Sequence, residues 1–254
     1  MRLRVLGCSG GIAALEKTTS LLLDDDLLID AGTGVGDLTL DELARIRTVF
    51  LTHSHLDHVA CLPLLLDSVF DQLDAPVTVH GLPETLRALR QHIFNDVIWP
   101  DFARLPDPEH PVLRYVELEP GSPVTVGNRT LTSIWVNHAV PALGYRVEAP
   151  AGSFAFSGDT TTNDNLWRAL NAGPALSMLI VECAFSDEDA ELSIASRHYC
   201  PKLLADDLRK LQQTTKIYLT HPKPGDEDTI FSQCQGHLAG YQLHRLCAGD
   251  RFEL

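Results

Sequence analysis

The stretch Thr52-His53-Ser54-His55-Leu56-Asp57-His58 decides how the rest of this chain is interpreted. The apolar, β-branched run at residues 48–51 before it predicts a buried strand, and the leucine-rich run at residues 62–66 after it predicts a helix. The histidines therefore stand where a strand gives way to a helix.

These side chains are ligand types at a spacing that favours two metal ions. On an extended chain His53 and His55 point to the same side, so both rings can reach one ion. Asp57 and His58 follow where the chain turns, and we expect their side chains to diverge toward a second point. The i, i+4 pair of a metalloprotease helix is not present in this stretch. A solvated polar loop with incidental histidines is the alternative, and it is disfavoured because unpaired imidazoles beside a buried strand gain nothing.

Composition limits the class of substrate and the domain organisation. The chain has 254 residues, 44% of them hydrophobic, which predicts a large core and a single domain over residues 1–254. Its 34 acidic and 20 basic residues give a net charge of -14. This charge argues against a nucleic-acid polymer as the substrate, because Lys/Arg surfaces hold phosphate backbones. A small anion is still compatible, because bound cations reverse the local field.

The cysteines and the N-terminus predict a reduced, cytoplasmic protein without a membrane partner. The six cysteines form no Cys-x-x-Cys pair, so neither a zinc ribbon nor a thioredoxin-like site is indicated. Residues 1–7 lead directly into a strand pattern and lack the apolar region of a signal peptide. No apolar run reaches the ~18 residues of a membrane span.

Further ligand types follow three other predicted strands. Residues 130–136 lead to His138, residues 153–156 lead to Asp159, and residues 216–219 lead to His221. Sheet sandwiches gather such strand ends at one edge. We expect one ion at His53, His55 and His138, and the other at Asp57, His58 and His221, with Asp159 bridging. Each set leaves a position open for water, which is typical of a catalytic site. The lone His80 and His92 are expected to be structural.

In their order along the chain these residues resemble the motifs of the metallo-β-lactamase superfamily. Those motifs are His-x-His-x-Asp-His, a single His, a bridging acid and a final His. Lactamases proper typically carry Cys where this chain has Asp159, so antibiotic hydrolysis is disfavoured. Segments 18–22, 29–32 and 157–160 are similar to the phosphodiesterase branch, which includes tRNA 3′-processing endonucleases and class II cyclic-nucleotide phosphodiesterases.

Within that branch the chain resembles the class II cyclic-nucleotide phosphodiesterases. Segments that carry this resemblance are 53–58, 92–95, 98–102, 140–145 and 221–225. Cys61 and Pro63 depart from the small and aliphatic residues expected after the core motif. The tRNA-processing relatives use a protruding basic arm, and this chain has no Lys/Arg-rich insertion.

The resemblance implies an α/β (α+β) fold, a four-layer αββα sandwich with the site at one edge. It also implies a dinuclear metal-dependent hydrolase that opens 3′,5′-cyclic nucleotides, cAMP and also cGMP, to 5′-monophosphates through a hydroxide activated by two metal ions. Asp57 would hold the proton of the nucleophile while it ligates. Imidazole-rich ligation suits zinc best, and manganese or iron would also bind.

A general acid is expected at His198, where the phosphodiesterase branch carries a further histidine. It would give a proton to the leaving 3′-oxygen, and Glu182 would orient its imidazole. The alternatives are an ordinary surface histidine and a strand-end salt-bridge partner.

Three other functions are compatible with the same ligands. They are a thioester or lactone hydrolase, a hydrolase of another phosphodiester such as a tRNA 3′ end, and a non-enzymatic metal-binding or redox module. The open coordination positions and the lack of a flavin domain disfavour the last. The aromatic residues 93–102 would line the site or bury a dimer contact, and an exposed Ile98-Trp99 pair would fit a homodimer.

Overall fold

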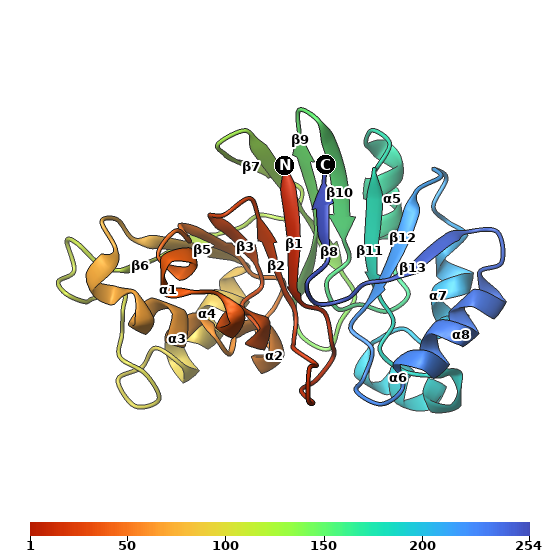
Figure 1. The fold of residues 1–254 in the computed structure, drawn as a ribbon, viewed down its shortest axis with the longest axis horizontal. Coiled ribbons are helices and arrows are strands. Elements are labelled where there is room, and N and C mark those ends of the chain that lie inside the picture. Colours follow the sequence, from red (N-terminus) through yellow and green to blue (C-terminus); the bar gives the residue numbers. More distant parts are fainter.

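The strands of this chain form two seven-stranded sheets that pack face to face, as Figure 1 shows for the computed structural model of residues 1–254. The first sheet has the order β14-β1-β2-β3-β4-β5-β6. Its strands are β1 (Arg2–Gly7), β2 (Ser20–Leu23), β3 (Leu27–Ile29), β4 (Thr48–Phe50), β5 (Val77–Gly81), β6 (Leu113–Glu117) and β14 (Arg251–Glu253).

The second sheet has the order β13-β12-β11-β10-β9-β8-β7. Its strands are β7 (Pro123–Val126), β8 (Arg129–Val136), β9 (Ala142–Ala149), β10 (Gly152–Phe156), β11 (Met178–Glu182), β12 (Lys216–Thr220) and β13 (Gln242–Arg245). Within each sheet the neighbours are antiparallel on one side, and four strands, β3 to β6 or β10 to β13, are parallel. Parallel strands end at a common edge, which is where α/β proteins place their ligands.

Helices cover the outer face of each sheet (Figure 1). The first sheet carries α1 (Leu40–Leu43), α2 (Leu56–Val59), α3 (Leu62–Ser68) and α4 (Pro83–His92), and the second carries α5 (Asn165–Ala172), α6 (Ala190–Ser196), α7 (Pro201–Leu208) and α8 (Glu227–His237). Pro83 and Pro201 stand at the start of their helices, where the missing N–H of proline costs nothing. No helix is both long and apolar enough to cross a bilayer.

Three hydrophobic cores lie between the four layers. Side chains along a strand point alternately to its two faces, so one strand contributes to two cores. In β11 the side chains of Met178 and Ile180 lie between the two sheets, while Leu179 and Val181 lie under the helices of the second sheet. Both faces of such strands are buried, which explains their continuous apolar sequence. The predicted four-layer αββα sandwich is confirmed.

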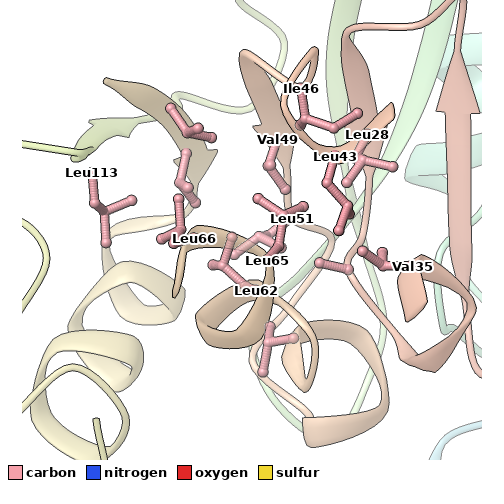
Figure 2. Packing of buried hydrophobic residues seen from close by; sticks show 14 of the residues in the cluster. Leu28, Val35, Leu43, Ile46, Val49, Leu51, Leu62, Leu65, Leu66 and Leu113 are labelled. Atoms are coloured by element: carbon pink, nitrogen blue, oxygen red, sulfur yellow. The ribbon is translucent and has the colours of Figure 1, made fainter. Parts of the chain in front are cut away.

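The core between the first sheet and its helices contains the leucine-rich run that follows the histidine motif. Figure 2 shows Leu62, Leu65 and Leu66 of α3 beside Val49 and Leu51, which flank the carboxyl end of β4. This packing holds the strand end and the helix on either side of the motif in place.

The aromatic segment at residues 93–102 is anchored at both ends. Phe94 and Phe102 are buried in the same core, whereas Val97 and Ile98 are exposed. The segment takes no part in the two ligand groups described below. A homodimer contact at Ile98 stays a prediction.

Candidate metal centre

The first half of the centre comes from one short segment between β4 and α2. The chain is still extended at His55, with φ -64° and ψ 148°, and α2 begins at the next residue. The rings of His53 and His55 therefore lie on one side, with centroids 4.6 Å apart. Asp57 and His58, which we expected on a turning chain, lie in the single turn of α2 and point to a second position.

The second half comes from three separate strand ends of the other sheet. His138 follows β8, Asp159 follows β10, and His221 follows β12. Gly158, just before Asp159, has a φ of +59°, and a Cβ there would lie 2.4 Å from the carbonyl oxygen of Leu143. Only glycine fits this close approach, which turns Asp159 toward the first half.

The structure brings all seven predicted ligand residues together in two groups. Within each group one ligand atom from every residue lies within 4.8 Å of the others. One group is His53, His55, His138 and Asp159, and the other is Asp57, His58, Asp159 and His221. Each group takes two residues from each half of the centre, and Asp159 belongs to both.

Asp159 is the central residue of this arrangement. Its Oδ2 lies 3.2 Å from Nε2 of His58, 3.3 Å from that of His221, 3.6 Å from that of His53 and 4.0 Å from that of His138. Burial would raise the pKa of Asp159, but the imidazoles of His221, His58 and His53 hold it well below its usual range. The carboxylate is therefore ionised and faces four imidazole nitrogens.

Buried nitrogen atoms without partners show that the residues fit a metal centre. Nε2 of His53, His58 and His221 is buried and has no hydrogen-bond partner in the protein. Leaving buried polar atoms unpaired costs about 1–3 kcal/mol each. Burial lowers the pKa of His138 to about 4 and that of His221 to about 3, so both are neutral at pH 7. Neutral imidazole and carboxylate are the forms that bind divalent ions such as zinc.

Asp30 is a buried carboxylate that orients the first half, and no local pattern in the sequence marks it for this role. Its Oδ2 lies 2.7 Å from Nδ1 of His58, and its two oxygens accept hydrogen bonds of 2.8 Å from the amide and the hydroxyl of Thr52. These contacts leave Nε2 of His58 facing the centre. Asp30 belongs to the segment 29–32 that carried the family resemblance. Its partners Thr52 and His58 lie 22 and 28 residues further along the chain, so no local pattern indicates these contacts.

Other residues orient two further histidines, His138 and His221, in the same manner. Oγ1 of Thr19 lies 3.2 Å from Nδ1 of His221, and the backbone carbonyl of Arg197 lies 3.0 Å from Nδ1 of His138. A partner on Nδ1 fixes the ring and leaves Nε2 free to ligate. The sequence could not identify these pairs, because their members are 202 and 59 residues apart.

His198 and Glu182 form a buried pair beside the two groups. Nδ1 of His198 lies 2.8 Å from Oε1 of Glu182, which also accepts a hydrogen bond from the amide of Thr160 at 2.9 Å. The His198 ring lies 4.9 Å from that of His138 and 5.5 Å from that of His221. Burial lowers the pKa of His198, but the charge and hydrogen bond of Glu182 outweigh this and raise it above its usual value. His198 is thus not an ordinary surface residue.

Asp57 is the more accessible of the two carboxylates in the centre, whereas Asp159 is almost fully buried. Its side chain is 28% exposed, and its Oδ2 lies 3.6 Å from Nε2 of His58 and 3.7 Å from that of His221. Among the seven, it offers a carboxylate that can contact both an ion and an incoming water molecule.

Comparison with known proteins gives a family match and sequence relatives. The family model described as "Beta-lactamase superfamily domain" matches residues 26–222. The "3′,5′-cyclic-nucleotide phosphodiesterase" of Schizosaccharomyces pombe is 28% identical over 197 residues, which are 68% of this chain and 54% of that protein. The "Ribonuclease Z" of Methanopyrus kandleri is 28% identical over 155 residues, which are 58% of this chain and 50% of that protein. This chain spans about half the length of these two relatives.

A solved structure supports the fold over the whole chain. Unliganded yeast PDE1 superposes with a TM-score of 0.82 at 18% identity, and the match covers 100% of this chain and 99% of that one. At this identity the likeness bears on the fold alone.

Proposed function

The chain belongs to the metallo-β-lactamase superfamily of metal-dependent hydrolases, and from this premise we propose that it hydrolyses 3′,5′-cyclic nucleotides to 5′-monophosphates. The observation that carries the proposal is the pair of open ligand groups that share Asp159, with the buried pair of His198 and Glu182 beside them. The centre can hold two ions, and the pair can supply a proton. Hydrolysis of a phosphodiester whose leaving group is an alkoxide uses both functions.

The relatives support this substrate class. The Schizosaccharomyces pombe protein carries the name of a cyclic-nucleotide phosphodiesterase, and 68% of this chain matches it. Because the chain spans about half of that relative, the activity of the whole protein is part of the proposal. We propose zinc as the metal, since five of the seven candidate ligands are imidazoles.

The residues of the chain have separate tasks in the reaction. When bound, two divalent ions supply a hydroxide at neutral pH and offset the charge of the phosphoryl oxygens. The partly exposed carboxylate of Asp57 holds the proton of the attacking water. His198 gives a proton to the leaving 3′-oxygen of the ribose. Glu182 binds Nδ1 of His198 and so keeps Nε2 for that transfer.

RNA is the second candidate substrate, because the ribonuclease Z relative matches 58% of this chain. The net charge of -14 opposes it, since long RNA is held through its phosphates by basic surfaces. We therefore place a small cyclic nucleotide first.

The experiment is hydrolysis of 3′,5′-cyclic AMP by the zinc-loaded and the manganese-loaded protein, with the product position read by chromatography. We expect 5′-AMP from the wild type and from Asp71→Ala, whose aspartate is exposed and outside the centre. Asp57→Ala should form none. Bound metal without turnover of any cyclic nucleotide would overturn the proposal, and RNA, thioesters and lactones would then be the substrates to assay.

A further inference from the structure

A cavity of about 420 Å³ opens beside His138. Its walls come from the carboxyl end of β8, the loop that follows it, the start of α5, and Arg197. This volume lies in the range of about 300–1,000 Å³ that is typical of small-molecule sites. His138 belongs both to the cavity wall and to a ligand group, and its side chain has no exposed surface, so a molecule in the cavity would be separated from the candidate metal centre by this one residue.

The charge of the cavity wall differs from that of the rest of the protein. Apart from His138, the only titratable side chain in the wall is Arg197, and no Asp or Glu contributes to it. The chain as a whole has a net charge of -14. A cavity of about 480 Å³ elsewhere is lined by three acidic residues, Asp71, Asp74 and Glu109, together with His110 and Arg114. The cavity beside His138 is thus suited to a neutral or anionic ligand.

Arg197 is held firmly against the metal centre. Its Nη1 donates a hydrogen bond of 2.8 Å to the carbonyl oxygen of His138, and its own carbonyl lies 3.0 Å from Nδ1 of the same residue. Its φ of +58° is in the left-handed region, which non-glycine residues rarely adopt. These contacts fix the cavity wall relative to the ligand groups.

Trp135 gives the cavity an aromatic wall that solvent can reach. Its side chain is 41% exposed on β8, and Pro141 lies on the same cavity. A nucleobase has a flat face that stacks on an indole, whatever its hydrogen-bonding edge. Asn165, also exposed in the wall, offers an amide to such an edge.

We propose that this cavity receives the nucleoside part of the substrate, with the base stacked on Trp135 and its polar edge toward Asn165 and Arg197. The inference rests on the proposed function, because it assigns a subsite for the same substrate. It makes Trp135 a determinant of substrate binding and leaves the metal centre responsible for the phosphodiester.

Steady-state kinetics of Trp135→Ala provide the first test. We expect KM for 3′,5′-cyclic AMP to rise about 5- to 100-fold while kcat changes little, because a stacking contact is lost. Trp135→Phe should recover much of the loss. Hydrolysis of bis(4-nitrophenyl) phosphate, a diester without base or ribose, should be unaffected in both variants. Ile98→Ala, which removes an exposed apolar side chain that is not part of the cavity wall, is the matched control.

A binding measurement with zinc-loaded protein provides the second test. Trp135 is exposed, whereas Trp167 is 1% exposed and Trp99 is half-buried, so Trp135 should report a ligand by its fluorescence. Titration with 5′-AMP should quench the wild-type emission saturably, and Trp135→Phe should lose this change. Equal quenching in Trp135→Phe would overturn the inference. So would an unchanged wild-type emission at concentrations of 5′-AMP that inhibit turnover.

The two proposals fail in different ways. If cyclic AMP is hydrolysed and Trp135→Ala leaves its KM unchanged, the cavity is not the nucleoside subsite and the proposed function stands. If the loaded wild type cleaves bis(4-nitrophenyl) phosphate but no cyclic nucleotide, the proposed function fails, and the subsite fails with it.

Discussion

The two halves of the candidate metal centre are built in different ways. The first half places four ligand residues within the six residues from His53 to His58, where β4 leads into α2. The second half takes His138, Asp159 and His221 from three strand ends of the other sheet. A local motif can therefore supply half of each ligand group, but the complete group forms only when the two sheets have packed correctly.

His58 of the first half and His138 of the second half differ in how they are oriented. In the first half the partner of His58 is the carboxylate of Asp30. In the second half the partner of His138 is the backbone carbonyl of Arg197. A side-chain partner can be removed by substitution, whereas a carbonyl remains in every variant that keeps the backbone. His58 should therefore be more sensitive than His138 to substitution of its partner, and His221, whose partner is the hydroxyl of Thr19, should resemble His58.

The largest effect is expected from Asp159→Ala, which removes the residue that both ligand groups share. Metal content should fall from two ions toward none, and kcat should fall more than about 1000-fold, because both ions act in the reaction. His55→Ala alters one group only and should retain one ion. Metal analysis with circular dichroism as a folding control makes the comparison. Two retained ions in Asp159→Ala would show that the halves do not meet at this residue.

His198→Ala should lower kcat for 3′,5′-cyclic AMP about 100-fold or more, because the leaving 3′-oxygen needs a proton. The same variant should hydrolyse bis(4-nitrophenyl) phosphate almost as well as the wild type, since 4-nitrophenolate leaves without protonation. Glu182→Gln should show the same selectivity in milder form. An equal loss on both diesters would mean that His198 supports the second half structurally.

Asp30→Asn should weaken metal binding about 10- to 100-fold, because it removes the carboxylate that orients His58. Breaking this buried pair should also lower the free energy of unfolding by about 3–5 kcal/mol. Competition with a chelator gives the affinity, and urea unfolding gives the stability. Arg197→Gly is the matched variant in the second half, because it keeps the carbonyl at a φ that suits glycine. An effect of Arg197→Gly on affinity as large as that of Asp30→Asn would contradict the contrast between His58 and His138.

The smallest effect concerns His80, a histidine of the first sheet that lies outside the ligand groups. It is buried and stacks on Phe50 with centroids 4.4 Å apart, and burial lowers its pKa to about 4. The unfolded chain binds this proton near pH 6.5, so the contribution of His80 is fully present above pH 6.5 and is lost as the pH falls toward 4. The free energy of unfolding falls by about 2–3 kcal/mol over this pH range because of His80.

Urea unfolding at pH 7.5 and pH 5 should therefore show a smaller loss of stability in His80→Phe than in the wild type. Activity at pH 7.5 should be unchanged. His92→Gln, at an exposed position, serves as the control. If His80→Phe and the wild type respond to pH alike, His80 is not neutral in the core.

Sequence patterns predicted the strands and the ligand residues at their ends, because buried strands and clustered histidines are local signals, and the family resemblance implied the sandwich. Asp30 carried no such signal, since a single acid after a strand acquires its meaning only from partners in the next strand and helix. The chain after the segment 221–225 also carried no clear signal of its structure. Only Ile230 and Cys234 of α8 are buried, so this helix lacks a clear apolar stripe, and packing on the second sheet determines it.

Each ligand group takes two residues from each half of the centre. This division affects how stable the protein is in a cell. A bound ion would act as a cross-link between the halves, and any ligand that binds only the folded state shifts the folding equilibrium by mass action. A chain that matures under metal starvation would then lose more than activity. Its halves would separate more readily, and proteases would remove it sooner, so the supply of metal would set how much of the protein accumulates.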